Sequence, residues 1–262
     1  MEYHHIKVEV KDAVLVIAFN RPEVLNSFHL PMAREVQDAL GVAAADDNIR
    51  AVLVTGEGRG FCAGQDLAAV NVDTEPKDDL GETVRAQYNP IIRSIRRLEK
   101  PVVCAVNGVA AGAGANMAFA CDLVFASTEA SFIQSFSRIG LIPDSGGTFF
   151  LPRLVGLARA SGLALLGGKV GAAQAKEWGL IWETCEPAAL LPRAMEVAAS
   201  LATQPTRGFG LTKQALNESL INDLDAQLDL EADLQGEAGR TEDFGEGVSA
   251  FRAKRAPLFR GR

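Results

Sequence analysis

One acidic residue and one glycine-rich turn are the parts of this sequence with the clearest chemical potential. Asp144 stands beside a glycine pair, Gly146-Gly147. Upstream, Gly112-Ala113-Gly114 follows an apolar run and opens a helix-like stretch, so a ligand can approach its backbone closely. The N–H groups of a helix's first turn lack partners within the helix and carry the positive end of its dipole. An oxyanion held there, facing one carboxylate, is an arrangement suited to proton transfer.

The elements around these residues alternate between strand and helix. Short apolar runs are typical of buried strands, and apolar residues at near-helical spacing follow them. The predicted strands are Ile6–Val10, Val14–Phe19, Ala51–Thr55, Val102–Val106 and Leu123–Ala126, and helices are predicted from about Leu30 and from Ala113. Lys11-Asp12 predicts a hairpin turn between the first two strands. The alternation indicates an α/β fold, in which helices pack outside a mostly parallel, layered sheet.

The chain changes character after Pro152, where strand signals nearly vanish. The helical runs predicted there are Ala158–Leu166, Ala172–Trp178, Ala188–Ala202, Arg207–Leu216 and Ile221–Arg240. Residues 201–262 are predicted to be a helical appendage whose apolar stripe packs on a neighbouring subunit, and residues 1–200 to be the core. Between the sheet-forming stretches, the acidic segment Ala68–Leu80 lacks an apolar period. It is predicted to be a mobile loop that flanks the ligand cleft.

Composition favours one large domain, with or without an appendage, and a small partner. A chain of 262 residues can bury a sizeable core. Its 26 basic and 33 acidic residues give a net charge of −7, the wrong sign for binding nucleic acid or an anionic membrane. The N-terminus has no apolar core of signal-peptide length, and no run reaches the ~18 apolar residues of a membrane span. We therefore expect a soluble protein that binds neither membrane nor nucleic acid.

The four cysteines predict free thiols rather than disulfides or a zinc site. Cys62, Cys104, Cys121 and Cys185 form no C-x-x-C pair, and the first three sit among small or apolar residues. Free thiols fit a reducing compartment, so a cytoplasmic location is expected. No metal is expected.

Several local motifs combine into one pattern along nearly the whole chain. They are Asn20-Arg21-Pro22 with Leu25-Asn26, FCAGQDL at 61–67, NGVAAGAGA at 107–115, GLIPDSGGT at 140–148, and Glu246-Gly247 with Phe251 and Lys254. In order and spacing they resemble the enoyl-CoA hydratase/isomerase (crotonase) superfamily. The resemblance implies a ClpP/crotonase-like fold of repeated ββα units. It also implies a C-terminal helical region that forms homotrimers, which often pair into hexamers.

The resemblance also assigns roles to individual residues. Members of the superfamily hold an acyl-CoA thioester carbonyl between two backbone N–H groups, here those of Gln65 and Ala113. Removing one such donor typically costs ~2.7–4 kcal/mol of transition-state stabilisation. No separate cofactor is implied, because CoA is part of the substrate. The positions implied to bind acyl-CoA are Val24, Leu25, Ala63, Gly64, Gln65, Asp66, Leu67, Gly112, Asn116 and Phe136, with Phe251 and Lys254 reaching the CoA of a neighbouring subunit.

Two positions separate the branches of the superfamily. Its hydratases carry two glutamates that activate water, and Asn116 and Phe136 stand at these places. Neither side chain can take a proton from water, so hydration is disfavoured and a drier pocket for a ring-bearing acyl group is favoured. Asp144 matches the aspartate of the isomerase and dehalogenase branches. From local sequence alone, a helix-cap or turn role for Asp144 stays open.

The dehalogenase branch needs a histidine near its aspartate. The only histidines, His4, His5 and His29, precede the first oxyanion segment, so this branch is disfavoured. The remaining expectation is an acyl-CoA isomerase that converts ring-1,2-epoxyphenylacetyl-CoA to its seven-membered oxepin form in phenylacetate catabolism. The alternatives are a general Δ3,Δ2-enoyl-CoA isomerase or weak enoyl-CoA hydratase, and a non-catalytic acyl-CoA-binding or assembly subunit.

Overall fold

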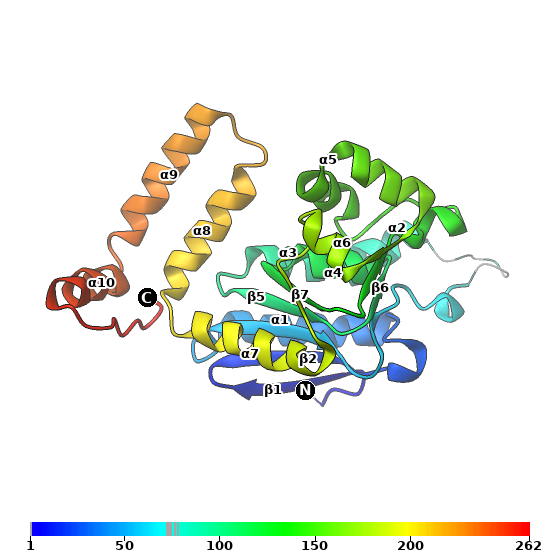
Figure 1. The fold of residues 1–262 in the computed structure, drawn as a ribbon, viewed down its shortest axis with the longest axis horizontal. Helices are drawn as coiled ribbons and strands as arrows, with labels where there is room; N and C mark the ends of the chain where they lie inside the picture. Colours follow the sequence, from blue (N-terminus) through cyan, green and yellow to red (C-terminus); the bar gives the residue numbers. More distant parts are fainter. Residues whose placement is uncertain (1, 72–74, 76, 78) are drawn as a thin grey trace.

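Two sheets form the centre of the molecule in the computed structural model, which describes residues 2–71, 75, 77 and 79–262 (Figure 1). In order across the larger sheet, the strands are β1 (Ile6–Lys11), β2 (Val14–Phe19), β3 (Ala51–Gly56), β5 (Val102–Val106), β7 (Leu123–Ser127) and β10 (Glu183–Cys185). The smaller sheet orders β4 (Gly60–Cys62), β6 (Val109–Ala111), β8 (Ser131–Ile133) and β9 (Lys169–Gly171). All pairings are parallel except β1 with β2 and β8 with β9. The predicted hairpin and α/β class are confirmed.

Three successive units build both sheets. In each, one strand enters the larger sheet, the next enters the smaller sheet, and a helix follows: β3–β4–α3, β5–β6–α4 and β7–β8–α5. The helices are α1 (Leu30–Ala45), α2 (Leu80–Thr83), α3 (Asn89–Arg97), α4 (Ala113–Ala120), α5 (Gly147–Leu166), α6 (Ala172–Glu177), α7 (Pro187–Ala202), α8 (Thr206–Glu218), α9 (Leu224–Ala238) and α10 (Glu242–Ala253). The repeated strand–strand–helix pattern confirms the fold that the motifs imply.

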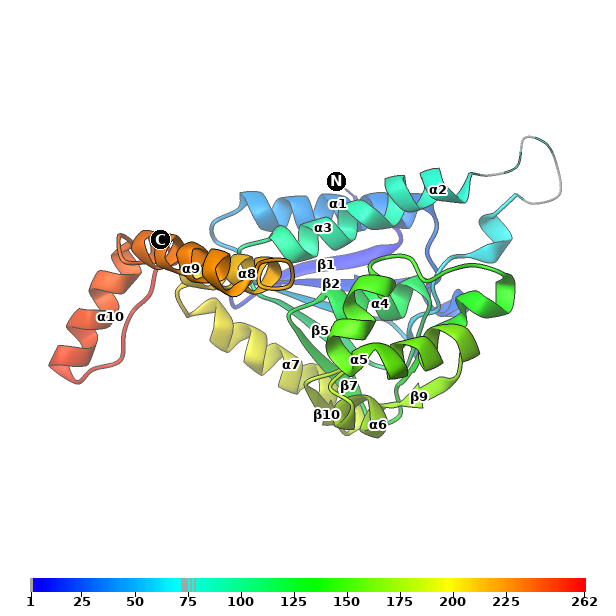
Figure 2. The ribbon, with the colours of Figure 1, turned by 90° about the horizontal axis from the view of Figure 1, so that it is seen from above.

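Alternate side chains along the strands of the larger sheet pack into two separate hydrophobic clusters, one on each face of the sheet. Along β3, Val52 and Val54 pack toward α1 and α3, whereas Leu53 faces the cluster formed with α7. Figure 2 shows α1 and α3 on one side of the sheet and α7 on the other. Because successive strand residues point to opposite faces, a strand covered on both sides must be apolar throughout. This explains the continuous apolar runs that predicted the central strands.

The sequence missed five strands, the helices α2, α3 and α10, and the start of one further helix. The strands β4, β6, β8, β9 and β10 each have three residues, too short to show an alternating pattern. The run Ala158–Leu166 is the second half of α5, which begins at Gly147. Gly156 separates the halves with a non-helical φ of 77° and ψ of 160°. The predicted loop Ala68–Leu80 falls partly outside the described residues, and its last residue begins α2.

Within the described part of the chain, α5 is the one helix with the length and composition to cross a membrane. The break at Gly156 divides it into halves of about 15 Å each, against a hydrocarbon core of ~30 Å. Arg153 stacks over the Phe149 ring at 3.7 Å, and α5 packs against α4. Only 22 % of its apolar window is buried within the chain.

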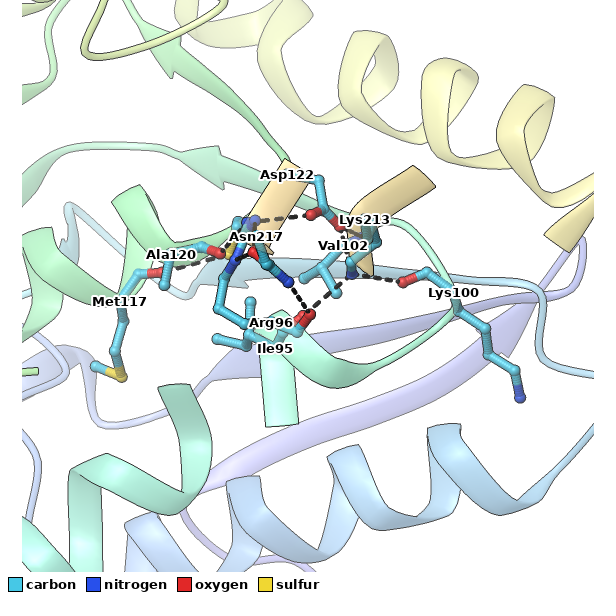
Figure 3. A network of polar contacts seen from close by, with 10 residues as sticks. Ile95, Arg96, Lys100, Val102, Met117, Ala120, Asp122, Lys213 and Asn217 are labelled. Carbon is cyan, nitrogen blue, oxygen red and sulfur yellow. Dashed lines mark hydrogen bonds and ion pairs between the residues drawn. The ribbon is translucent and has the colours of Figure 1, made fainter. Parts of the chain in front are cut away.

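Helices α8 to α10 form an arm that extends from the core (Figure 1). A buried polar network fixes its first helix (Figure 3). The Lys213 ammonium lies 2.7 Å from Asp122 Oδ2, and Arg96 donates to Asn217 Oδ1 at 2.6 Å. Arg96 also donates to the carbonyl of Ala120, the last residue of α4, at 3.1 Å. The arm is thus joined to the end of the helix that begins at Ala113. The division at residue 201 stays a prediction.

Candidate active site

The two glycine-rich turns singled out from the sequence touch one another. Gly64 has a φ of +90°, which favours glycine. A Cβ placed on it would lie 2.9 Å from the carbonyl oxygen of Ala111 and 3.5 Å from the backbone nitrogen of Ala113. Only a residue without a side chain fits this approach. The segments that carry Gln65 and Ala113 are therefore brought together, although they come from different units of the fold.

The peptide between Gly64 and Gln65 has a fixed orientation. The N–H of Phe28 donates to the Gly64 carbonyl at 2.7 Å, and the N–H of Asp66 donates to the Phe28 carbonyl at 2.8 Å. In a planar trans peptide the N–H points opposite to the C=O. The N–H of Gln65 therefore points away from Phe28, and among the described residues it has no acceptor.

The second N–H belongs to the first residue of α4. Gly112 precedes it with φ 53° and ψ −126°, and its own N–H donates to the Ile133 carbonyl at 2.9 Å. Ala113 then starts the helix, and its N–H has no acceptor among the residues that the structure describes. A Cβ on Gly114 would lie 2.4 Å from the Cys62 carbonyl oxygen, so α4 begins directly against β4. Two unpaired donors thus lie on touching segments.

Asp144 is half-buried at the entrance to α5. Its Oδ1 accepts a hydrogen bond from the Ser145 hydroxyl at 2.8 Å. Burial raises the pKa of this carboxyl, and hydrogen bonds from Ser145 and from its own backbone N–H oppose the rise. The structure shows no helix-cap role, because the cap position of α5 is Gly146 and no side chain caps it. It does show a turn role, since the Gly147 N–H donates to the Asp144 carbonyl at 2.8 Å. A role of the carboxylate in proton transfer stays a prediction.

Asn116 connects α4 to the Asp144 segment. Its Nδ2 donates to the Asp144 carbonyl at 2.8 Å, and its Oδ1 accepts from Gln134 Nε2 at 2.8 Å. The side chain has 0 % exposure, so its contacts are internal and it reaches no open pocket. The implied contact of Asn116 with the substrate stays a prediction, and what the structure shows is this contact with the Asp144 segment.

Phe136 forms an apolar wall beside the second donor. Its ring is buried, and its Cζ lies 3.6 Å from where a Cβ on Gly112 would stand. A phenyl ring at this place offers no hydrogen bond to a water molecule. The predicted drier surface therefore lies next to the unpaired N–H of Ala113.

Sequence reasoning missed Tyr88. This residue ends a π-helical segment, Val84–Tyr88, and its hydroxyl donates to the side-chain Oε1 of Gln65. Burial raises the pKa of the phenol, and the charges of Cys62, Asp144 and Asp66 raise it further. A π turn adds one residue per turn and shifts the apolar period, so periodicity gave no signal for this position.

The predicted CoA-binding residues 24–25 and 63–67 lie on two segments that are joined by a backbone hydrogen bond. The N–H of Ala63 donates to the Leu25 carbonyl at 2.9 Å, and Val24 and Leu67 are exposed beside it. The Asp66 carboxylate lies 2.9 Å from Arg21 and caps a short 3-10 turn. The Asp66 carboxylate therefore binds other groups of the protein, and only the backbone of Asp66 is left for the predicted contact with CoA.

Phe251 and Lys254 lie elsewhere. Both are on α10 or directly after it, at the far end of the arm from α4 and α5 (Figure 1). Phe251 is 85 % exposed. Within one chain, the structure does not bring these two residues to Asp144.

His5 and His29 contact one another, and Nδ1 of His29 is buried with no hydrogen-bond partner among the described residues. The rings of His5 and His29 stack edge to face with centroids 4.5 Å apart, and His29 directly precedes α1. Burial lowers the pKa of His29, and Arg21 lowers it further while Asp66 raises it. His29 is therefore nearer to the first oxyanion segment than its place in the sequence suggests. Among the described residues, no group of three His, Cys, Asp or Glu side chains could hold a metal ion.

Comparison with known proteins identifies the family to which this chain belongs. Residues 9–262 match the family model for enoyl-CoA hydratase/isomerase. The chain belongs to this family. It is 54 % identical over 254 residues to 1,2-epoxyphenylacetyl-CoA isomerase of Escherichia coli K12, which covers 97 % of both chains. It is 46 % identical to a protein of Rhodobacter capsulatus named "probable enoyl-CoA hydratase", over the full length of both.

Solved structures agree with the fold. A crystal structure of enoyl-CoA hydratase from Bacillus anthracis superposes with a TM-score of 0.91 at 32 % identity, covering 99 % of this chain and 100 % of that one. The crotonase fold and family implied by the sequence motifs are therefore confirmed.

Proposed function

We propose that this protein is an acyl-CoA isomerase that converts ring-1,2-epoxyphenylacetyl-CoA to the oxepin form. The 54 % identity to an isomerase with the same substrate in its name supports this choice. The observation that carries the proposal is geometric. Two unpaired backbone donors lie on touching segments, and Asn116 ties the helix that holds one of them to the segment of a single free carboxylate.

In this proposal, the N–H groups of Gln65 and Ala113 form the oxyanion hole. They bind the thioester carbonyl oxygen, which gains negative charge when the α-carbon loses a proton. Donors fixed before the reaction stabilise this charge without reorganising. Gly64 and Gly112 serve here by letting the acyl group approach the backbone.

Asp144 is the proposed proton shuttle. Its carboxylate takes the α-proton, and the electron pair of that C–H bond moves into the conjugated system as an enolate. The carbon–carbon bond shared by the epoxide and the six-membered ring opens electrocyclically: its electron pair joins the two π bonds of the ring, which gives the three double bonds of the seven-membered ring. The enolate pair then moves onto the ring carbon γ to the thioester carbonyl, and Asp144 returns the same proton there, which leaves an exocyclic double bond at the α-carbon. Atoms and electrons balance, no water is consumed, and Asp144 ends as a carboxylate.

The surroundings of the carboxylate support isomerisation over hydration. Asn116 and Phe136 stand where two acids would be needed to activate water, and neither side chain presents a proton acceptor to the site. We therefore expect crotonyl-CoA hydration to be slow or absent.

The remaining parts of the proposal concern CoA, assembly and location. Val24, Leu25 and the segment 63–67 would border the CoA, which arrives with the substrate, so no further cofactor is proposed. Phe251 and Lys254 would reach the CoA of a neighbouring subunit in a trimer or hexamer, which fits their place on the arm. The four free cysteines support a cytoplasmic location.

Three substrates assayed in parallel test the function. Purified protein is supplied with epoxyphenylacetyl-CoA, a 3-enoyl-CoA and crotonyl-CoA, and the products are followed by absorbance and mass. The proposal expects turnover of the first substrate and little of the third. Faster turnover of the 3-enoyl-CoA would favour a general enoyl-CoA isomerase. Crotonyl-CoA hydration near the ~10⁸ M⁻¹s⁻¹ of the fastest enzymes would contradict the proposal. Binding without turnover or α-proton exchange would favour a non-catalytic subunit.

A further inference from the structure

The hydroxyl of Tyr88 donates a hydrogen bond to the side-chain Oε1 of Gln65, the residue whose backbone N–H is one of the two unpaired donors. Tyr88 is 1 % exposed. A buried phenol needs a partner for its O–H, and in this structure the partner is this glutamine.

The backbone around Gln65 follows a residue with wide conformational freedom, Gly64, and is held by bonds on both sides. The N–H of Phe28 donates to the Gly64 carbonyl at 2.7 Å, and the N–H of Asp66 donates to the Phe28 carbonyl at 2.8 Å. The bond from Tyr88 adds a third tether, to the side chain of Gln65 itself, which the two backbone bonds do not hold.

Tyr88 is itself held in place. Its ring lies 6.0 Å from the ring of Phe28, the residue that provides the first tether. The π-helical segment Val84–Tyr88 places this ring, and π turns occur often at functional sites. The raised pKa of the phenol keeps it protonated near neutral pH, so it remains a donor.

We propose that Tyr88 is a positioning residue for the oxyanion hole, acting through the side chain of Gln65 to fix the direction of that residue's backbone N–H. This inference rests on the proposed function only where it says that the oxyanion hole contributes to catalysis. The effect of Tyr88 on the direction of the Gln65 N–H applies to any acyl-CoA thioester whose carbonyl binds in the oxyanion hole.

The test compares the only two tyrosines of the chain. Tyr88→Phe removes one hydroxyl and keeps the ring, and Tyr3→Phe removes a hydroxyl that instead donates to Asp38 at 2.8 Å. Each variant is loaded with phenylacetyl-CoA labelled with ¹³C at the thioester carbonyl, which carries no epoxide to isomerise. Infrared difference spectra then give the carbonyl stretch of the bound ligand.

The expected result is a carbonyl stretch in Tyr88→Phe that returns part of the way to its value in solution. A misaligned donor also predicts that kcat for epoxyphenylacetyl-CoA falls by roughly tenfold to a hundredfold with KM changed less than about threefold. Tyr3→Phe is expected to match the wild type in both. An unchanged stretch and kcat in Tyr88→Phe would overturn the inference.

A second variant keeps the test decisive if Tyr88→Phe folds poorly. Gln65→Met keeps the backbone N–H and the length of the side chain but removes the acceptor. If Tyr88 acts through Gln65, the two single variants and the double variant lose the same activity, whereas independent effects would multiply. Multiplied losses would overturn the inference. A carbonyl shift in a wild type that fails to turn over epoxyphenylacetyl-CoA would overturn the proposed function and leave this inference standing.

Discussion

The side-chain amide of Asn116 donates to the backbone carbonyl of Asp144 across 2.8 Å. Asn116 lies on α4, the helix whose first residue is Ala113, so one rigid element carries an unpaired N–H at its start and fixes the carboxylate segment from its side. The resemblance to the superfamily's hydratases implies a water-activating acid at this position, whereas here an amide binds the protein.

Asp144→Asn tests whether the carboxylate moves the proton. The variant keeps the shape of the side chain and can still bond to Ser145, but it cannot accept a proton. We expect isomerisation to fall by the ~10²–10⁴ typical of losing a general base, with folding and acyl-CoA binding retained. Isomerase rate and α-proton exchange in deuterated water are measured together. Asp223→Asn is the control, because Asp223 caps α9 on the arm and asparagine also caps helices.

Exchange at the wild-type rate in Asp144→Asn would mean that another group carries the proton. Loss of binding or assembly in this variant would instead mean that Asp144 is structural. Either outcome removes the single-carboxylate mechanism.

The pH profile follows from the raised pKa of Asp144. The base must be deprotonated to work, so activity is lost as the pH falls through a pKa that lies above the ordinary value of an aspartate. Ser145→Ala removes a hydrogen bond that lowers this pKa, and the acid limb of kcat should move to higher pH. A limb that stays in place or moves to lower pH contradicts the assignment.

The raised pKa of Asp144 should also affect stability, but in the opposite direction: raising the pH increases activity and lowers the free energy of unfolding. The folded state holds the proton of Asp144 more tightly than the unfolded state does, so unfolding free energy decreases as the pH rises between the two pKa values. Asp144→Asn should remove this decrease. Thermal unfolding followed across the same pH range checks it.

Gly147→Ala tests the support that Asn116 provides. A Cβ on Gly147 would lie 2.4 Å from Asn116 Nδ2, and Asn116 is fully buried and cannot swing away freely. We expect the Asp144 segment to shift and kcat to fall by up to ~10²-fold, the loss that a misplacement of about 1 Å can cause. Gly162→Ala on the same helix is the control, since a Cβ there meets nothing within 4 Å. Equal activity of the two variants would show that the contact is not needed.

The sequence predicted the two glycine-rich turns that the structure brings together, but not the side-chain contacts beside them. Glycines at 64 and 112 exposed the backbone of the next residues, and this local feature can be seen without a structure. The bond from Tyr88 to Gln65 depends on a π turn, and that from Asn116 to Asp144 depends on how two units of the fold meet. Strands β9 and β10 are held by partners from other units, and their three residues carry no pattern of their own.

Oligomerisation is expected from the exposed apolar residues of the arm. Leu224 and Phe251 are 72 % and 85 % exposed, which favours burial against another subunit. Light scattering at micromolar concentration should therefore give the mass of a trimer or a hexamer. A stable monomer would remove both this assembly and the proposed role of Lys254 across the interface.

Lys213→Met tests how firmly the arm is joined to the core. Lys213 is 7 % exposed, and the change leaves the Asp122 carboxylate with Arg96 and one backbone N–H (Figure 3). Removing one partner of a buried ion pair is typically destabilising by ~3–5 kcal/mol, so chemical denaturation should show a loss of about 3 kcal/mol. Lys7→Met is the matched control: its pair with Glu57 at 2.9 Å is exposed, and such pairs contribute about 0–1 kcal/mol. Equal losses in Lys213→Met and Lys7→Met would show that the network does not anchor the arm.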